Sequence, residues 1–237
     1  MSAVVALAGV FATLPAHARC LGTWFHVVNA EAPIATNGRI LVEGFAQPRE
    51  LLDDIATRKP VLRNRRGGKD IVPLRVVETR RGEVARNQVL LEPERPLLPS
   101  QTYRLDFVGL PDDTALYVKT AAGPDTTAPS WNAPTTVRER ARVGLGCGPS
   151  VFVTLAVGAA DDSGYLLAHV EVKRLRDGHT AAAFVAIEDG TIAVGHGMCG
   201  GMFRLDAGAA YEIRTAVVDS AGNGVGDPSS PVSVIAP

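Results

Sequence analysis

The chain has 237 residues, 46% of them hydrophobic and 5% aromatic, and a formal net charge of −1. It has no excess of basic or acidic residues of the kind that favours nucleic acid or a membrane surface as partner, so neither is expected. The length suits one large domain or two of about 100 residues each. The 24 glycines and 16 prolines indicate many turns, as in an all-β protein.

The N-terminus resembles an export signal. Residues 4–14 form an apolar run too short to span a bilayer, and residues 16–18 (Ala-His-Ala) place small side chains before a cleavage site. Residues 1–3 lack the usual basic residue, so an ordinary apolar N-terminus remains the alternative. We predict a signal peptide over residues 1–18, no membrane span in the mature protein, and a secreted, periplasmic or cell-surface location.

The first half shows a series of short β-prone segments. They are residues 24–28, 39–45, 61–65, 71–77, 89–93, 103–108 and 116–119. Between the second and third of these, Leu51, Leu52 and Ile55 lie at helical spacing before Pro60, which predicts a short helical insert. We place the first domain at residues 21–123.

Residues 123–131 mark a junction between two folded units. Pro124 and Pro129 favour extended backbone, and the polar residues between them favour turns. Beyond this junction, β-prone segments recur at residues 137–143, 151–157, 169–175, 182–187, 191–194, 202–205, 211–218 and 230–235. The sequence therefore predicts a linker at residues 124–131 and a second domain at residues 132–237, both domains being β-sandwiches.

The two halves share a local pattern. Leu97 stands six residues before Tyr103, and Leu205 stands six residues before Tyr211; each tyrosine opens a β-prone run. This spacing is similar to the tyrosine corner of Greek-key sandwiches, in which the phenol caps the turn between two strands. Tyr103 and Tyr211 are therefore predicted to be structural.

Three segments of the second half carry a family resemblance. Residues 125–129 resemble an Asp-Thr-Thr-x-Pro opening, residues 160–164 resemble the loop after the second strand, and residues 218–223 resemble an Asp-x-Ala-Gly-Asn turn. Together these motifs resemble bacterial Ig-like or fibronectin type III-like modules of surface proteins. Residues 30–120 resemble the same modules more loosely, because the helical insert departs from a minimal sandwich.

The resemblance implies a function without catalysis. Such modules are spacers, stalks or interaction units of exported proteins, and the fold confers no particular chemistry. We expect a non-enzymatic two-domain protein with a structural, spacer or protein-interaction role. The alternative is a module that binds surface polysaccharide through the basic hairpin formed by Arg63, Arg65, Arg66 and Lys69.

A hydrolase is the least favoured alternative. Cys147 or Ser150 could be combined with His169 or His196, but neither cysteine lies in a catalytic signature and Gly-x-Ser-x-Gly is absent. His196 and Cys199 lack the second His/Cys pair of a zinc site.

Charged residues are expected to meet at the junction. In an Ig-like arrangement, the loops carrying Asp125, Asp161, Asp162, Asp219 and Asn223 share one end of the second domain. Two interpretations are open: these oxygen ligands hold Ca²⁺, or Arg65, Arg66 and Lys69 neutralise them and no cofactor is needed. The second is favoured because the basic residues are already present, and weak ion pairs would leave the junction hinged.

The three cysteines lead to a testable prediction. Cys147 and Cys199 both lie among glycines, so their backbones could approach to disulfide distance, which leaves Cys20 free or intermolecular. Two free thiols are the alternative. There is one difficulty. If Cys147 begins the second strand and Cys199 begins the fifth, a regular sandwich would place the two cysteines at opposite ends of the domain. We predict a Cys147–Cys199 disulfide, detected as a linked peptide on non-reducing peptide mapping; alkylation of both thiols in native, oxidised protein would contradict it.

Overall fold

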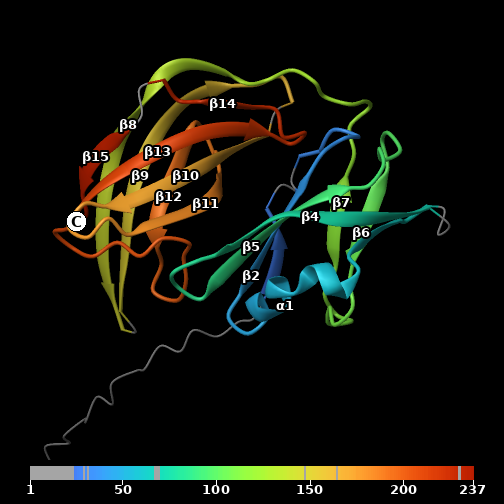
Figure 1. The fold of residues 1–237 in the computed structure, drawn as a ribbon, viewed down its shortest axis with the longest axis horizontal. Helices are drawn as coiled ribbons and strands as arrows, with labels where there is room; N and C mark the ends of the chain where they lie inside the picture. Colours follow the sequence, from blue (N-terminus) through green and yellow to red (C-terminus); the bar gives the residue numbers. More distant parts are fainter. Residues whose placement is uncertain are drawn as a thin grey trace, which may run out of the picture.

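The computed structural model describes residues 24–28, 30, 32–66, 70–146, 148–163, 165–228 and 231–237. These residues form an all-β protein of two β-sandwiches lying side by side (Figure 1). The predicted signal peptide, Cys20, Lys69 and Cys147 lie outside the described residues. The predicted helical insert is present as α1 (Arg49–Asp53), followed by a 3₁₀ turn at Ile55–Arg58, and Leu52 and Ile55 bury their side chains in the first sandwich.

The first sandwich has seven antiparallel strands. They are β1 (Trp24–Val27), β2 (Ile40–Phe45), β3 (Val61–Asn64), β4 (Ile71–Arg81), β5 (Arg86–Pro93), β6 (Thr102–Asp106) and β7 (Leu116–Lys119). The hydrogen-bonded order is β1-β2-β5-β4-β3-β6-β7. Because β4 pairs with β3 through its first residues and with β5 through the rest, it connects the two layers, and its register shifts between Val76 and Glu78. This strand order is that of an Ig-like Greek key.

The second sandwich has two separate sheets. One contains β8 (Ser130–Leu145), β9 (Gly148–Ala160) and β12 (Thr191–His196). The other contains β10 (Leu166–Arg174), β11 (Thr180–Ala186), β13 (Ala210–Asp219), β14 (Gly224–Gly226) and β15 (Val232–Ile235). Alternate residues of β9 and β13 point into the core between the sheets, as the period-2 pattern predicts.

Two boundaries differ from the sequence prediction. β8 begins at Ser130, so the last two residues of the predicted linker belong to a strand. Residues 202–205 were expected to form a strand but run as a loop. Phe203 and Leu205 are buried in the core, whereas the backbone N–H of Arg204 donates to Glu83 of the first sandwich. Apolar residues therefore alternate in this segment because Phe203 and Leu205 are buried, although the segment does not form a strand.

The surroundings of Cys199 bear on the predicted disulfide. Cys199 is disulfide-bonded, and its partner lies outside the described residues. β9 and β12 are antiparallel with His196 opposite Val151, and the backbone N–H of Met198 donates to Ser150 Oγ at 3.0 Å. The segment after β12 therefore lies beside the start of β9. Cys199 follows β12 instead of beginning a strand, so the expected separation of two strand starts does not apply to it. Its pairing with Cys147 stays a prediction.

Both tyrosines hydrogen-bond to the backbone five residues upstream. The hydroxyl of Tyr103 accepts from the N–H of Leu98 at 3.0 Å, and that of Tyr211 accepts from the N–H of Asp206 at 2.8 Å. This is tyrosine-corner geometry. Tyr103 also donates to Asp70 Oδ2 at 2.8 Å. The pKa of Asp70 is lowered, first by a hydrogen bond from Arg95 and also by the one from Tyr103, so Tyr103 has an ionised acceptor.

These contacts predict unequal effects of removing the two hydroxyls. Tyr211→Phe should lower the free energy of unfolding by about 1 kcal/mol, the usual net value of one buried hydrogen bond. Tyr103→Phe should cost about 2 kcal/mol, because it also removes a bond to a charged acceptor. Chemical denaturation measures both, with the exposed Tyr117→Phe as control. Equal stability of all three variants and the parent protein would contradict a capping role.

Candidate functional site

The two sandwiches meet through an apolar patch. Leu41 and Leu90 project from β2 and β5 and pack on Leu167 and Phe184 from β10 and β11. This contact explains why every residue of β2 is buried: alternate side chains face the core of the first sandwich, and the others face the second sandwich. Burial of both faces is unusual for an antiparallel sheet that would otherwise be half exposed. We call this contact the interface patch.

Gln88 adds a polar contact at the centre of the interface patch. It has no exposed surface, and its side-chain amide donates to the carbonyl oxygen of Phe184 at 2.7 Å. The amide oxygen accepts from the N–H of Phe184 at 3.0 Å, and the NH₂ group also donates to Glu43 at 2.6 Å. β11 is an edge strand, and the backbone N–H and C=O groups on such an edge can pair with another strand. Gln88 binds these two groups of Phe184 instead.

A histidine lies beside this amide contact. His169 of β10 is close to Arg80 of β4, with 3.1 Å between Nε2 and Nη2, and its ring contacts Phe184 with 5.2 Å between centroids. Burial lowers the pKa of His169, and the charge of Arg80 lowers it further. The neutral imidazole is therefore the form that the interface favours.

Backbone contacts join the sandwiches on the linker side of the patch. The N–H of Arg39 donates to the carbonyl oxygen of Ser220 at 2.6 Å. The side chain of Asn37 donates to the carbonyl of Asp125 at 2.7 Å and accepts from its N–H at 2.9 Å. The linker is thus held at Asp125 by the first sandwich.

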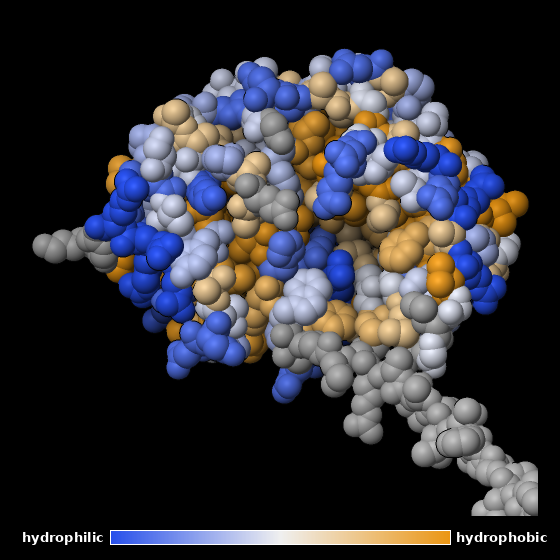
Figure 2. Space-filling view, turned by 180° about the vertical axis from the view of Figure 1, so that it is seen from behind, coloured by the Kyte–Doolittle hydropathy of each residue, from blue (hydrophilic) through white to orange (hydrophobic). Residues whose placement is uncertain are grey.

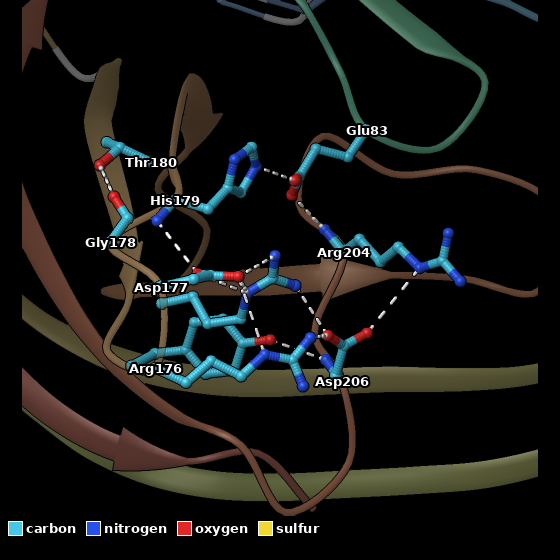
Figure 3. A network of polar contacts seen from close by, with 10 residues as sticks. Glu83, Arg176, Asp177, Gly178, His179, Thr180, Arg204 and Asp206 are labelled. Atoms are coloured by element: carbon cyan, nitrogen blue, oxygen red, sulfur yellow. Dashed lines mark hydrogen bonds and ion pairs between the residues drawn. The ribbon is translucent and has the colours of Figure 1, made fainter.

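The opposite side is closed by the β4–β5 turn, which reaches the second sandwich (Figure 1). Val84 and Gly201 form an antiparallel bridge, with hydrogen bonds of 3.1 and 2.8 Å. Figure 3 shows the carboxylate of Glu83 between His179 and the backbone of Arg204, at 2.7 and 2.6 Å. Apolar packing and backbone hydrogen bonds therefore join the sandwiches, in place of the few exposed ion pairs on which the expectation of a hinge rested.

The charged network in Figure 3 extends this contact within the second sandwich. Arg174 bridges Asp177 and Asp206, with Nη1 2.7 Å from Asp206 Oδ2, and Arg176 also reaches Asp206 at 3.0 Å. The hydrogen bond from Arg174 is the main cause of the lowered pKa of Asp177. This network orders the β10–β11 turn, which positions His179 opposite Glu83.

The structure brings together part of the predicted acidic site. Asp125, Asp161 and Asp162 each offer a carboxylate oxygen, and these oxygens lie within 4.8 Å of one another. Thr127 and Ser163 donate backbone N–H groups to one oxygen of Asp125 and of Asp161. Among the described residues, Asp125 Oδ2 and Asp161 Oδ1 are buried without a hydrogen-bond partner. These three residues could hold a hard cation such as Ca²⁺, with water completing its shell.

Asp219 and Asn223 contribute indirectly. Both oxygens of Asp219 accept from Asn223, at 2.9 and 2.8 Å. Asn223 also donates to the backbone carbonyls of Asp125 and Thr127, at 3.4 and 3.3 Å. Burial raises the pKa of Asp219, and the nearby charge of Asp125 raises it to a smaller extent. These two residues shape the linker around the three aspartates.

The basic hairpin does not neutralise this cluster in the described part of the chain. Arg63 pairs with Asp106 at 2.9 Å, and the guanidinium of Arg65 lies over the ring of Tyr117 at 4.9 Å. The backbone N–H of Arg66 donates to Asn64. Arg65 and Arg66 form no ion pair with Asp125, Asp161 or Asp162 among the described residues. The favoured sequence interpretation is therefore not supported for Arg65 and Arg66, whose contacts lie within the first sandwich, whereas Lys69 lies outside the described residues.

A cleft of about 630 Å³ lies beside the interface patch, between the sandwiches. Its first wall carries Trp24, His26, Glu43 and Arg86 from β1, β2 and β5. Its second wall is formed by residues of β9, β11, β12 and the following glycine-rich loop. Figure 2 shows a face of the molecule that is hollowed near its middle, where hydrophilic and hydrophobic side chains meet.

Of the residues considered for hydrolysis, Cys147 lies outside the described residues and the other three are engaged elsewhere. Ser150 Oγ accepts from the N–H of Met198, His196 contacts the carbonyl of Gly197 at 3.1 Å, and His169 contacts Arg80. The sequence did not single out the cleft: Trp24 was visible only as a rare tryptophan, and nothing in the local pattern of Glu43 or Arg86 indicated that they would meet it.

Comparisons with known proteins leave the family open. No family model matches the chain, and no curated protein matches it. Among solved structures, a pullulanase type I from Bacillus subtilis str. 168, complexed with maltose, is 13% identical with a TM-score of 0.29; the match covers 92% of this chain and 25% of the pullulanase. The FN1–FN3 domains of chicken CNTN1 are 14% identical with a TM-score of 0.28, covering 89% of this chain and 66% of that one. The chain thus spans about a quarter of the pullulanase and just under two thirds of the CNTN1 fragment.

The class that the structure defines is an all-β protein of two β-sandwich modules. None of its described helices has the length and apolar character needed to cross a membrane.

The acidic cluster predicts stabilisation by calcium. Adding Ca²⁺ should raise the melting temperature, because a cation would offset repulsion among three carboxylates; at about a hundred times its dissociation constant it would add about 2.7 kcal/mol. Differential scanning calorimetry in Ca²⁺ and in chelator measures this. Asp161→Asn should remove most of the calcium effect, whereas Asp112→Asn, which is exposed and does not belong to the cluster, should keep it. Identical melting with calcium and with chelator would exclude the site.

Proposed function

We propose that the chain is an exported, non-enzymatic two-domain module of the Ig-like or fibronectin type III-like kind, with a structural, spacer or protein-interaction role at the cell surface or in the periplasm. The observation that carries the proposal is the interface patch with its backbone contacts on both sides. A spacer or presenting unit needs a fixed relation between its domains, and these contacts supply one.

The distribution of polar groups is consistent with this proposal. The side chain of Gln88 hydrogen-bonds to the backbone of the edge strand β11 in the second sandwich. The β4–β5 turn hydrogen-bonds to the backbone of the glycine-rich loop after β12. Contacts of this kind favour one arrangement of the two sandwiches, since an alternative docking would leave buried polar groups unpaired. Two modules joined in this way would present constant surfaces to a partner.

A second candidate function is binding of polysaccharide. Its original basis, the basic hairpin, is weakened because Arg63 and Arg65 already have partners in the first sandwich. A different observation favours it: Trp24 keeps exposed surface in the cleft between the sandwiches. This cleft is not lined by Arg63 or Arg65.

The fixed arrangement can be tested by opening the interface patch. Leu90→Asp places a charge among Leu41, Leu167 and Phe184, and removal of the buried Leu side chain alone usually costs about 2–5 kcal/mol. The variant should show a larger radius of gyration by small-angle X-ray scattering, with each sandwich still folded by circular dichroism.

The matched control is Val108→Asp at a position that is 65% exposed. The control and the parent protein should stay equally compact at low and high salt, because apolar packing is not screened. An unchanged radius for Leu90→Asp, or an expanded parent protein, would contradict a fixed two-domain unit.

A further inference from the structure

Trp24 provides an aromatic surface in the wall of the cleft. Its side chain is 36% exposed, although the ring is stacked against Phe45, with 5.5 Å between centroids and 23° between planes. Trp24 and Phe45 are directly opposite on β1 and β2, and His26 contacts the indole edge-on at 6.2 Å. A tryptophan fixed in this way offers a large apolar surface at little entropic cost to a ligand.

Planar polar groups stand next to this surface. The guanidinium of Arg86 lies over the Trp24 ring, 5.2 Å from its centre, and pairs with Glu43 at 3.3 Å. Glu43 is held in turn by Gln88. Among the described residues the Nε–H of Arg86 has no acceptor. A fixed Arg–carboxylate pair beside an aromatic ring presents both donors and acceptors, as vicinal hydroxyls require, while its charges offset each other.

The second wall of the cleft is formed by the second sandwich. Phe152 and Thr154 of β9 and Thr191 and Ala193 of β12 line it, followed by a glycine-rich loop. A Cβ on Gly200 would lie 2.6 Å from the ring of Phe45, so only glycine allows this loop to approach the first sandwich so closely. The cleft is therefore built jointly by both sandwiches.

From these features we propose that the cleft binds a neutral oligosaccharide, with the part of the Trp24 indole that Phe45 and Arg86 leave exposed packing against a sugar ring and the Arg86–Glu43 pair binding its hydroxyls. Sugars combine an apolar face with many hydroxyls and carry no charge, and the lining matches each of these properties. The volume of about 630 Å³ is within the range of sites for ligands of a few rings. This inference deepens the proposed function and rests on it, because the cleft requires docked sandwiches.

The test uses tryptophan fluorescence, since Trp24 and Trp131 are the two tryptophans of the chain. The Trp131→Phe variant makes Trp24 the sole reporter. Titration of this variant with cellotetraose, maltotetraose, xylotetraose and chitotetraose should give a saturable change with at least one of them. Tetragalacturonate should bind more weakly than the best neutral sugar, because the charges in the cleft are already paired.

Calorimetry with the best sugar then separates the role of Trp24 from general stability. Trp24→Ala should weaken binding at least about tenfold, equivalent to about 1.4 kcal/mol. Tyr117→Ala should leave it unchanged; Tyr117 is a matched control because it is 37% exposed and carries Arg65 over its ring outside the cleft.

The inference is overturned if none of the neutral sugars gives a saturable change, if tetragalacturonate binds best, or if Trp24→Ala binds as the parent does. Scattering distinguishes this failure from failure of the proposed function. A compact parent protein that binds no sugar refutes the cleft assignment alone, whereas an expanded parent protein refutes the fixed two-domain unit itself.

Discussion

The packing of the β2–β5 face against β10 and β11 is the constraint on which the rest of the arrangement depends. It buries Leu41 and Leu90 outside the core of their own sandwich, and it buries Gln88 against the edge of β11. Removing apolar surface from water supplies the favourable term, and the amide contact makes it specific, because a shift would leave Gln88 and Phe184 unpaired.

Two candidate sites follow from this one contact. The acidic cluster of Asp125, Asp161 and Asp162 lies where the linker is held by Asn37 and Asn223. The cleft lies on the side of Trp24, where the two surfaces diverge. Neither sandwich contains the whole cleft, and Asp125 is positioned by residues of both. The chain thus illustrates how two modules of a common fold acquire distinctive surfaces through the way they dock.

The charged residues behave differently from the simplest expectation. Most arginines of the first sandwich pair locally, as Arg63 does with Asp106 and Arg75 with Glu92. By contrast, Glu83 reaches across to His179 and to the backbone of Arg204, where the contact is anchored by the neighbouring bridge between Val84 and Gly201. Exposed ion pairs contribute little by themselves, so the backbone bridge gives this contact its importance.

The fold class and the capping contacts of Tyr103 and Tyr211 could be predicted from the sequence. These depend on local rules: alternation of apolar residues marks strands, prolines and glycines mark turns, and a tyrosine caps a loop five residues away. The run at residues 202–205 is an exception, since its alternation was satisfied by burial in a loop. The grouping of Asp125, Asp161 and Asp162 was also within reach, because loops at one end of a sandwich converge.

The surface against which the outer face of β2 and β5 packs could not be predicted from the sequence. Alternation shows which side chains avoid water, but a strand that is buried on both faces, as β2 is, does not indicate its partner. The meeting of Trp24, Glu43 and Arg86, and the fold of the Arg63 hairpin onto its own sandwich, depend on strand order and on docking. Those contacts join residues far apart in the chain, and no local pattern encodes them, because their energy arises only when distant surfaces meet.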